Sequence, residues 1–142
     1  MSEPYAGLQD HYHEQVDKRQ KILRKLRKKY LAEFNRINRA YRAQRDSLSE
    51  ADRARGDALY KEARRLARRV NKLRRKTRKN AYDVDGFVKV LEVITDPTHR
   101  ALLHIRKIRL LMEMLEDIKK MIDGIREAAD IYNVLRTILQ GK

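Results

Sequence analysis

The sequence predicts an all-α fold, in which a long basic helical hairpin at the N-terminus precedes an apolar helical bundle. The chain of 142 residues contains only 5 Gly and 2 Pro, so residues that favour turns are scarce. Long stretches are rich in Ala, Leu, Arg, Lys and Glu, which stabilise helices. Apolar residues recur at steps of three and four, whereas the alternation typical of a strand is missing.

A first helix is expected over residues 8–46, because no residue in this stretch breaks a helix. Its apolar residues follow one another at steps of three or four, which places them on one face. They are Leu23, Leu26, Tyr30, Phe34, Ile37 and Tyr41. At 100° per residue, a row of basic residues falls on the opposite face. This row consists of Lys21, Lys25, Lys28, Arg36 and Arg39.

A second helix is expected to start within residues 47–52, where Ser47 and Ser49 each precede an acidic residue by three positions. This spacing is that of a capping box. The helix then continues to about Lys79, with Gly56 as a weak point in its first turns. Its apolar face consists of Leu59, Ala63, Leu66, Val70 and Leu73. The opposite face carries Lys61, Arg64, Arg65, Arg68, Lys72, Arg75 and Lys79.

Residues 80–86 are rich in turn-forming residues and are expected to separate two domains. Residues 1–80 would form a basic helix-turn-helix arm, and residues 81–142 an apolar helical domain. At the start of the second domain, Asp83 or Asp85 is the expected N-cap of a short helix over residues 87–94.

The rest of the chain is expected to be helical from Asp96 onward, because Asp96 followed by Pro97 is a strong start signal. Gly124 either splits this stretch or lies inside one long helix; we expect the split, because helices that fold back on each other bury more apolar surface. Gly141 is the expected C-terminal stop. Apolar residues cover more than one face of this stretch, so it either completes a self-contained bundle or binds other subunits, and we expect the second.

The excess positive charge lies entirely in the first 80 residues. Residues 1–80 hold 25 Lys and Arg against 10 Asp and Glu, whereas residues 81–142 hold 10 of each. The densest run, residues 64–79, contains 10 basic residues and no acidic one. A solvated helix face usually mixes both signs, and a membrane-surface helix needs a broad apolar face that these helices lack. Neutralisation by a long polyanion is the simplest explanation of so much repulsion.

Residues that support catalysis are sparse. The chain has no Cys, so disulfides and thiolate chemistry are excluded. Ser occurs only at positions 2, 47 and 49, and two of these are explained as helix caps. His11 and His13 lie two residues apart and do not share a helix face, which makes them a poor metal pair. We expect no enzyme activity, no cofactor and no metal site, since a Gly-rich phosphate loop is also missing.

The composition of the basic faces favours contacts with the backbone of a duplex. Arg outnumbers Lys in residues 64–79 and suits bidentate phosphate contacts. The basic faces offer few side chains for reading adenine and no aromatic cluster for stacking single-stranded bases; the Asn candidates are Asn35, Asn38 and Asn71. The expected phosphate contacts are Lys21, Lys25, Lys28, Arg36, Arg39, Arg64, Arg65, Arg68, Lys72, Arg75 and Lys79. Nearer the apolar faces, Arg27, Arg69 and Arg74 could also reach DNA if two helices enclose it.

The order of these segments resembles the major coat proteins of filamentous double-stranded-DNA viruses of hyperthermophilic archaea. The resemblance rests on residues 18–45, 47–52 and 53–79, followed by the helical stretch 96–140. It implies that the N-terminal helices wrap genomic DNA in an A-like form and that the C-terminal helices build the filament wall, often with a related second coat protein. It also implies a place in the virion after assembly in the host cytoplasm, with or without a membrane envelope.

Three other functions fit parts of the pattern. A helical RNA-binding component of a ribonucleoprotein would also use a basic hairpin, without open-ended assembly. A cellular chromatin-type protein would bind duplex DNA but coat it irregularly. A coiled-coil adaptor leaves the uneven charge unexplained.

Overall fold

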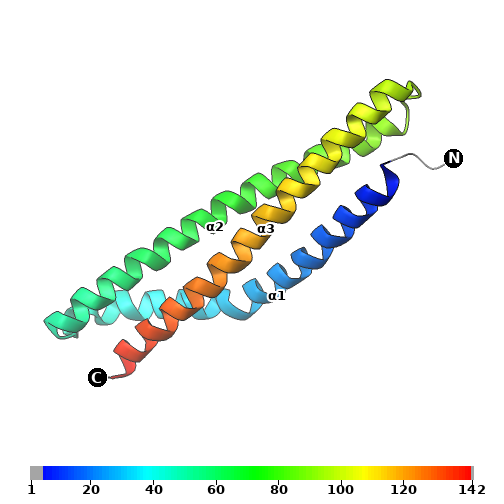
Figure 1. The fold of residues 1–142 in the computed structure, drawn as a ribbon. Helices are drawn as coiled ribbons and strands as arrows, with labels where there is room; N and C mark the ends of the chain where they lie inside the picture. Colours follow the sequence, from blue (N-terminus) through cyan, green and yellow to red (C-terminus); the bar gives the residue numbers. More distant parts are fainter. Residues whose placement is uncertain (1–4, 142) are drawn as a thin grey trace. The chain divides into compact units, whose positions relative to one another are not determined.

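A computed structural model describes residues 5–141 of the chain, and all regular structure in this part is helical. It contains α1 (Ala6–Gln44), a short 3₁₀ helix η1 (Arg45–Ser47), α2 (Glu50–Leu91) and α3 (Pro97–Gln140), of which the three α-helices are labelled in Figure 1. The all-α prediction is confirmed, and the first helix lies within two residues of its expected bounds.

The chain folds into two compact units. Unit 1 consists of the described residues up to Ile22 together with Lys72–Lys120, and unit 2 of Leu23–Asn71 together with the described residues from Met121 onward. Each of α1, α2 and α3 therefore contributes one stretch to each unit.

The core of unit 2 joins the apolar faces that the spacing predicts for the first two helices. Ile37 and Tyr41 of α1 pack in one cluster with Ala63 and Leu66 of α2. Stretches of α3 complete the cluster with Ala128, Tyr132, Leu135 and Ile138. The expected apolar residues of α1 are all buried or half-buried, so the predicted face is confirmed.

The two Ser residues that could cap the second helix make different hydrogen bonds in the connection between α1 and α2. The hydroxyl oxygen of Ser49 accepts a 3.2 Å hydrogen bond from the backbone N–H of Asp52, which is the bond of an N-cap. Ser47 instead donates a 2.7 Å hydrogen bond to the carbonyl oxygen of Gln44. Ser49 is therefore the cap of α2.

Gly56 does not interrupt α2, contrary to the expected weak point. The residue is buried, and a Cβ atom there would lie 2.7 Å from Cε2 of Tyr41. The missing side chain makes room for the Tyr41 ring, whose hydroxyl donates a 2.5 Å hydrogen bond to Oδ1 of Asp57. The cost of a helical Gly, about 1 kcal/mol, is offset by this close packing.

The expected turn at residues 80–86 is wrong, because α2 continues through it to Leu91. Thr77, Asn80, Val84 and Leu91 are buried, and their spacing extends the inner face of the helix. Asp83 and Asp85 consequently lie inside α2 and cap nothing, and residues 87–94 include the end of α2 instead of a separate helix. Burial of this face against the rest of unit 1 outweighs the local preference for a turn.

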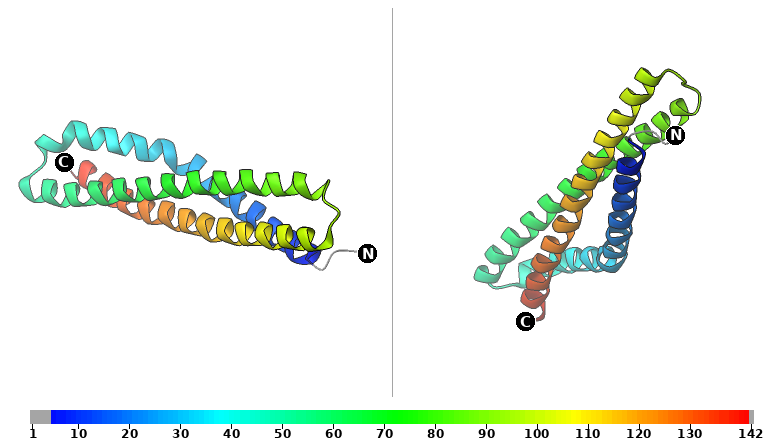
Figure 2. Two further views of the ribbon diagram at one scale, coloured as in Figure 1. Left: turned by 90° about the horizontal axis from the view of Figure 1, so that it is seen from above. Right: turned by 45° about the vertical axis from the view of Figure 1, so that its right-hand side comes forward.

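The start of α3 agrees with its sequence signal, but its interior does not. The N–H of His99 donates a 3.0 Å hydrogen bond to Oδ2 of Asp96, so the predicted cap is confirmed. Gly124 does not split the helix, and α3 is unbroken in both views of Figure 2. A Cβ atom on Gly124 would lie 3.0 Å from a methyl group of Val70, so this Gly lets α2 and α3 approach closely in unit 2. Gly141 follows the last helical residue, as expected.

The expected domain border at residue 80 lies inside α2. Both compact units combine residues from either side of it. The separation of DNA binding in residues 1–80 from assembly in residues 81–142 stays a prediction about function.

Candidate nucleic-acid interface

All eleven expected phosphate contacts have exposed side chains. In unit 2, α1 carries Lys25, Lys28, Arg36 and Arg39. These four lie opposite the face that holds Ile37 and Tyr41 in the core, over a length of about 21 Å at 1.5 Å per residue. The row is therefore a narrow, outward-facing basic stripe, here called the α1 stripe.

In unit 2, α2 carries a second basic row, the α2 stripe, formed by Arg64, Arg65 and Arg68. Arg65 is held by the carboxylate of Glu62 at 2.5 Å, one turn earlier on the same helix. This hydrogen-bonded pair raises the pKa of Arg65 and lowers that of Glu62. Arg64 and Arg68 are consequently the stronger candidates for phosphate contact on this stripe.

The two stripes of unit 2 face different sides. Each lies opposite the apolar face of its own helix, and both apolar faces contribute to one shared core. The two stripes therefore face different directions, although Arg64 also borders a cavity that α1 lines with Arg27 and Asn35.

In unit 1, the basic face of α2 carries Lys72, Arg75 and Lys79. Arg74 is half-buried, and Lys76 binds the carboxylates of Glu113 at 2.7 Å and Asp117 at 3.3 Å. Lys76 is therefore occupied within the protein.

Lys21 is the weakest of the expected contacts. It lines a surface hollow of unit 1 together with Lys18 and His13. Three acidic side chains line the same hollow, namely Asp10, Glu14 and Asp17. The local balance of charge there does not favour a phosphate.

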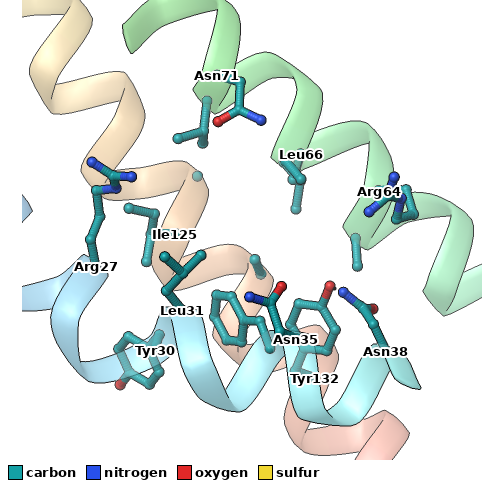
Figure 3. A pocket seen from close by; sticks show the side chains of 16 residues that line it. Arg27, Tyr30, Leu31, Asn35, Asn38, Arg64, Leu66, Asn71, Ile125 and Tyr132 are labelled. Carbon is teal, nitrogen blue, oxygen red and sulfur yellow. Dashed lines mark hydrogen bonds between the residues drawn. The ribbon is translucent and has the colours of Figure 1, made fainter. Parts of the chain in front are cut away.

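A cavity of about 210 Å³ opens in unit 2 between stretches of α1, α2 and α3. Arg27 of α1 and Arg64 of α2 lie on either side of it in Figure 3, with Asn71 above and Asn35 below in this view. Leu66 and Ile125 contribute to its apolar lining. The sequence places Arg27 near the apolar face of its helix, where we expect it to reach DNA. The sequence does not show that Arg27 shares a cavity with Arg64.

Asn38 is not placed to read a base. It is buried, and its side-chain oxygen accepts a 2.8 Å hydrogen bond from the hydroxyl of Tyr132. Asn35 and Asn71 are exposed. The amide of Asn38 therefore serves the core, and only the other two expected amides can face a ligand.

The aromatic rings of unit 2 are used within the protein. Phe34 stacks on Tyr132 at 4.3 Å between ring centroids and on Tyr30 at 5.4 Å. Tyr41 stacks on Tyr60 at 5.3 Å. Rings paired in this way are poor platforms for single-stranded bases, which need an open ring face.

Within residues 5–141, no group of three or more His, Asp or Glu side chains is arranged to hold a metal ion. In the same part of the chain, no helix is both long and apolar enough to span a membrane. Comparison with known proteins found no matching family model, no matching curated protein and no matching solved structure.

Proposed function

We propose that this chain is a structural coat protein of a virion that polymerises around double-stranded DNA and neutralises its phosphates without reading the base sequence. The observation that supports this most is the basic run of residues 64–79. Nine of its ten basic side chains are exposed, and Arg74 is half-buried. Two of the exposed ones, Arg65 and Lys76, are engaged by carboxylates of the protein. Seven exposed basic side chains remain along one continuous helix for contact with a polyanion.

The side chains around this run support a duplex as the polyanion. Guanidinium groups bind phosphate oxygens in bidentate fashion, and the run is rich in Arg. The aromatic rings of unit 2 stack on one another, so they favour a paired nucleic acid over a single strand. Contacts of this kind position a protein on DNA but do not specify a sequence.

The α1 and α2 stripes, which face different directions, support a role in packaging. A protein with basic stripes on two sides can neutralise two stretches of duplex at once, or one stretch shared with a neighbouring copy. Such bridging is suited to dense packing of DNA, whereas a single basic face is sufficient for a protein that only sits on the duplex.

Exposed apolar side chains of unit 1 support self-association. Val93 is 77% exposed and Leu102 45% exposed, and Val90, Ile105 and Met112 are also exposed. Residues 81–120 contain 7 basic and 7 acidic residues, so copies can approach there with little repulsion.

The test is electron microscopy of the purified protein with and without long duplex DNA, using charge reversals on α2. The double variant Arg68→Glu/Arg75→Glu is expected to lose filaments on DNA. The matched control Arg24→Glu/Arg55→Glu reverses two exposed basic residues outside both stripes and outside residues 64–79, and is expected to assemble normally.

Three outcomes would contradict the proposal. Unchanged filament yield in the α2 variant would remove the basic run from the interface. Discrete complexes with structured RNA would favour a ribonucleoprotein component, and irregular coating of duplex DNA would favour a chromatin-type protein.

A further inference from the structure

Small side chains of α2 and α3 leave room for the cavity of unit 2. Ala63 and Ala67 of α2 line it, as do Gly124 and Ala128 of α3. An apolar cavity of about 150 Å³ is large enough to hold a benzene molecule. The cavity of unit 2, at about 210 Å³, therefore has room for one aromatic ring with a polar group attached.

The charged side chains around this cavity are all positive. Among the described residues, none that lines it is acidic, whereas Arg27 and Arg64 lie on either side of it (Figure 3). The surface hollow of unit 1 differs in this respect, because acidic side chains there balance the basic ones. An excess of positive charge around an enclosed space favours an anion.

The positive charge of Arg64 acts on the wall of the cavity. Tyr132 is part of this wall, and burial raises the pKa of its hydroxyl, whereas the neighbouring positive charges of Arg64 and Arg42 act in the opposite direction. Arg64 is exposed, so its guanidinium can turn toward a ligand with little loss of hydration. An acidic group in the cavity would therefore be attracted to Arg64.

The rest of the lining combines hydrogen-bond donors with apolar surface. Asn35 and Asn71 are exposed, and each side-chain amide can donate to the oxygens of an acidic group. Leu66 and Ile125 are buried in the wall, and Leu31 beside them is 51% exposed. A ligand with an apolar body would cover Leu31 and remove apolar surface from water.

We propose that the cavity of unit 2 binds a small organic anion, whose compact apolar body lies against Leu31, Leu66 and Ile125 and whose acidic group binds Arg64. Arg27 adds to the positive potential from the other side. The site does not depend on DNA binding, although a bound anion and a duplex would compete for Arg64.

The test is an NMR titration of the full-length protein, without DNA, with two aromatic anions: benzoate and phenyl phosphate. At least one of them is expected to bind saturably and to shift the side-chain amide signals of Asn35 and Asn71 and the methyl signals of Leu66 and Ile125. Benzamide lacks the charge and acetate lacks the ring, and each is expected to bind about tenfold more weakly than benzoate.

Two variants with matched controls locate the site. Arg64→Gln is expected to weaken binding about tenfold, whereas Lys61→Gln, at an exposed position on the same helix outside the cavity, should not change it. Ala67→Phe fills the cavity without changing the charge and is expected to abolish binding. Ala58→Phe introduces the same ring at an exposed position outside the cavity and should leave binding intact.

Three results would overturn the proposal. They are the absence of saturable binding for both aromatic anions, equal affinity for benzoate and acetate, and unchanged affinity in Ala67→Phe. Ala67 is exposed, so its substitution is expected to preserve the fold, and circular dichroism of each variant checks this. Loss of DNA binding in any variant would not affect the result, because the titration contains no DNA.

Discussion

The hydroxyl of Tyr132 on α3 donates a 2.8 Å hydrogen bond to Asn38 on α1, joining residues 94 positions apart in the core of unit 2. Both residues are buried, and the same Tyr132 ring stacks on Phe34 of α1. Burial raises the pKa of Tyr132, so the hydroxyl keeps its proton and stays a donor at neutral pH. This pair fixes which face of α1 meets α3 in unit 2.

Loss of the Tyr132 hydroxyl should destabilise unit 2. Tyr132→Phe keeps the ring packing but leaves the oxygen of Asn38 buried without this donor, which is expected to cost about 1–2 kcal/mol in the free energy of unfolding. Urea denaturation followed by circular dichroism measures this difference. Tyr82→Phe, on a residue that is 79% exposed, should leave the urea midpoint unchanged. Equal midpoints for wild type and Tyr132→Phe would show that the bond contributes nothing.

Gly56 and Gly86 of α2 should respond in opposite ways to the same substitution. Gly56→Ala places a Cβ atom 2.7 Å from the Tyr41 ring and is expected to destabilise the protein by about 1–3 kcal/mol. Gly86→Ala meets no atom within 4 Å and is expected to stabilise it by roughly 0.5–1 kcal/mol, because Ala is the better helix former. Thermal unfolding of both variants compares the two. A stabilising Gly56→Ala would contradict the close approach of Tyr41 to α2.

The connection between α1 and α2 should weaken in acid. The guanidinium of Arg45 donates hydrogen bonds of 2.8 and 2.7 Å to the two carboxylate oxygens of Asp57, and Tyr41 donates a third. These bonds lower the pKa of Asp57 to about 2. Because the folded state binds this proton less tightly than the unfolded state, the stabilisation is complete above about pH 4 and is lost as the pH falls toward 2.

Melting temperatures of wild type and Asp57→Asn between pH 2 and 6 test this dependence. The variant should melt at a lower temperature at pH 6, and its difference from wild type should shrink toward pH 2. Asp46→Asn serves as the control, since Asp46 is 94% exposed and meets Arg45 only at 3.3 Å. A constant difference between wild type and Asp57→Asn across the range would refute the proposed linkage.

The helices and their apolar faces could largely be predicted from the sequence, because steps of three and four residues between apolar side chains are a local property. The continuation of α2 could not. Thr77 and Asn80 are polar, which favours a position on the surface. Both are nevertheless buried and extend the inner face of the helix past residue 80. The expected split of the last helix at Gly124 was wrong for a similar reason. The missing side chain of Gly124 allows a close approach to Val70, and only the fold creates this contact.

The candidate interface could be predicted in part. Exposure of the basic residues follows from their position opposite each apolar face, and all eleven are exposed. The α1 and α2 stripes face different directions because their two helices share one core, and the sequence does not show this arrangement. The occupation of Lys76 by Glu113 and Asp117 likewise requires contacts across 37 or more positions, for which a single sequence carries no signal.

The salt dependence of binding to long duplex DNA tests the central claim most directly. For seven phosphate contacts, the slope of log K against log salt concentration should be about −6, and Arg68→Ala/Arg75→Ala should make it less steep by about 2, with equal effects on DNA of any sequence. A slope near zero, or one that the two substitutions leave unchanged, would contradict phosphate neutralisation by the basic face of α2.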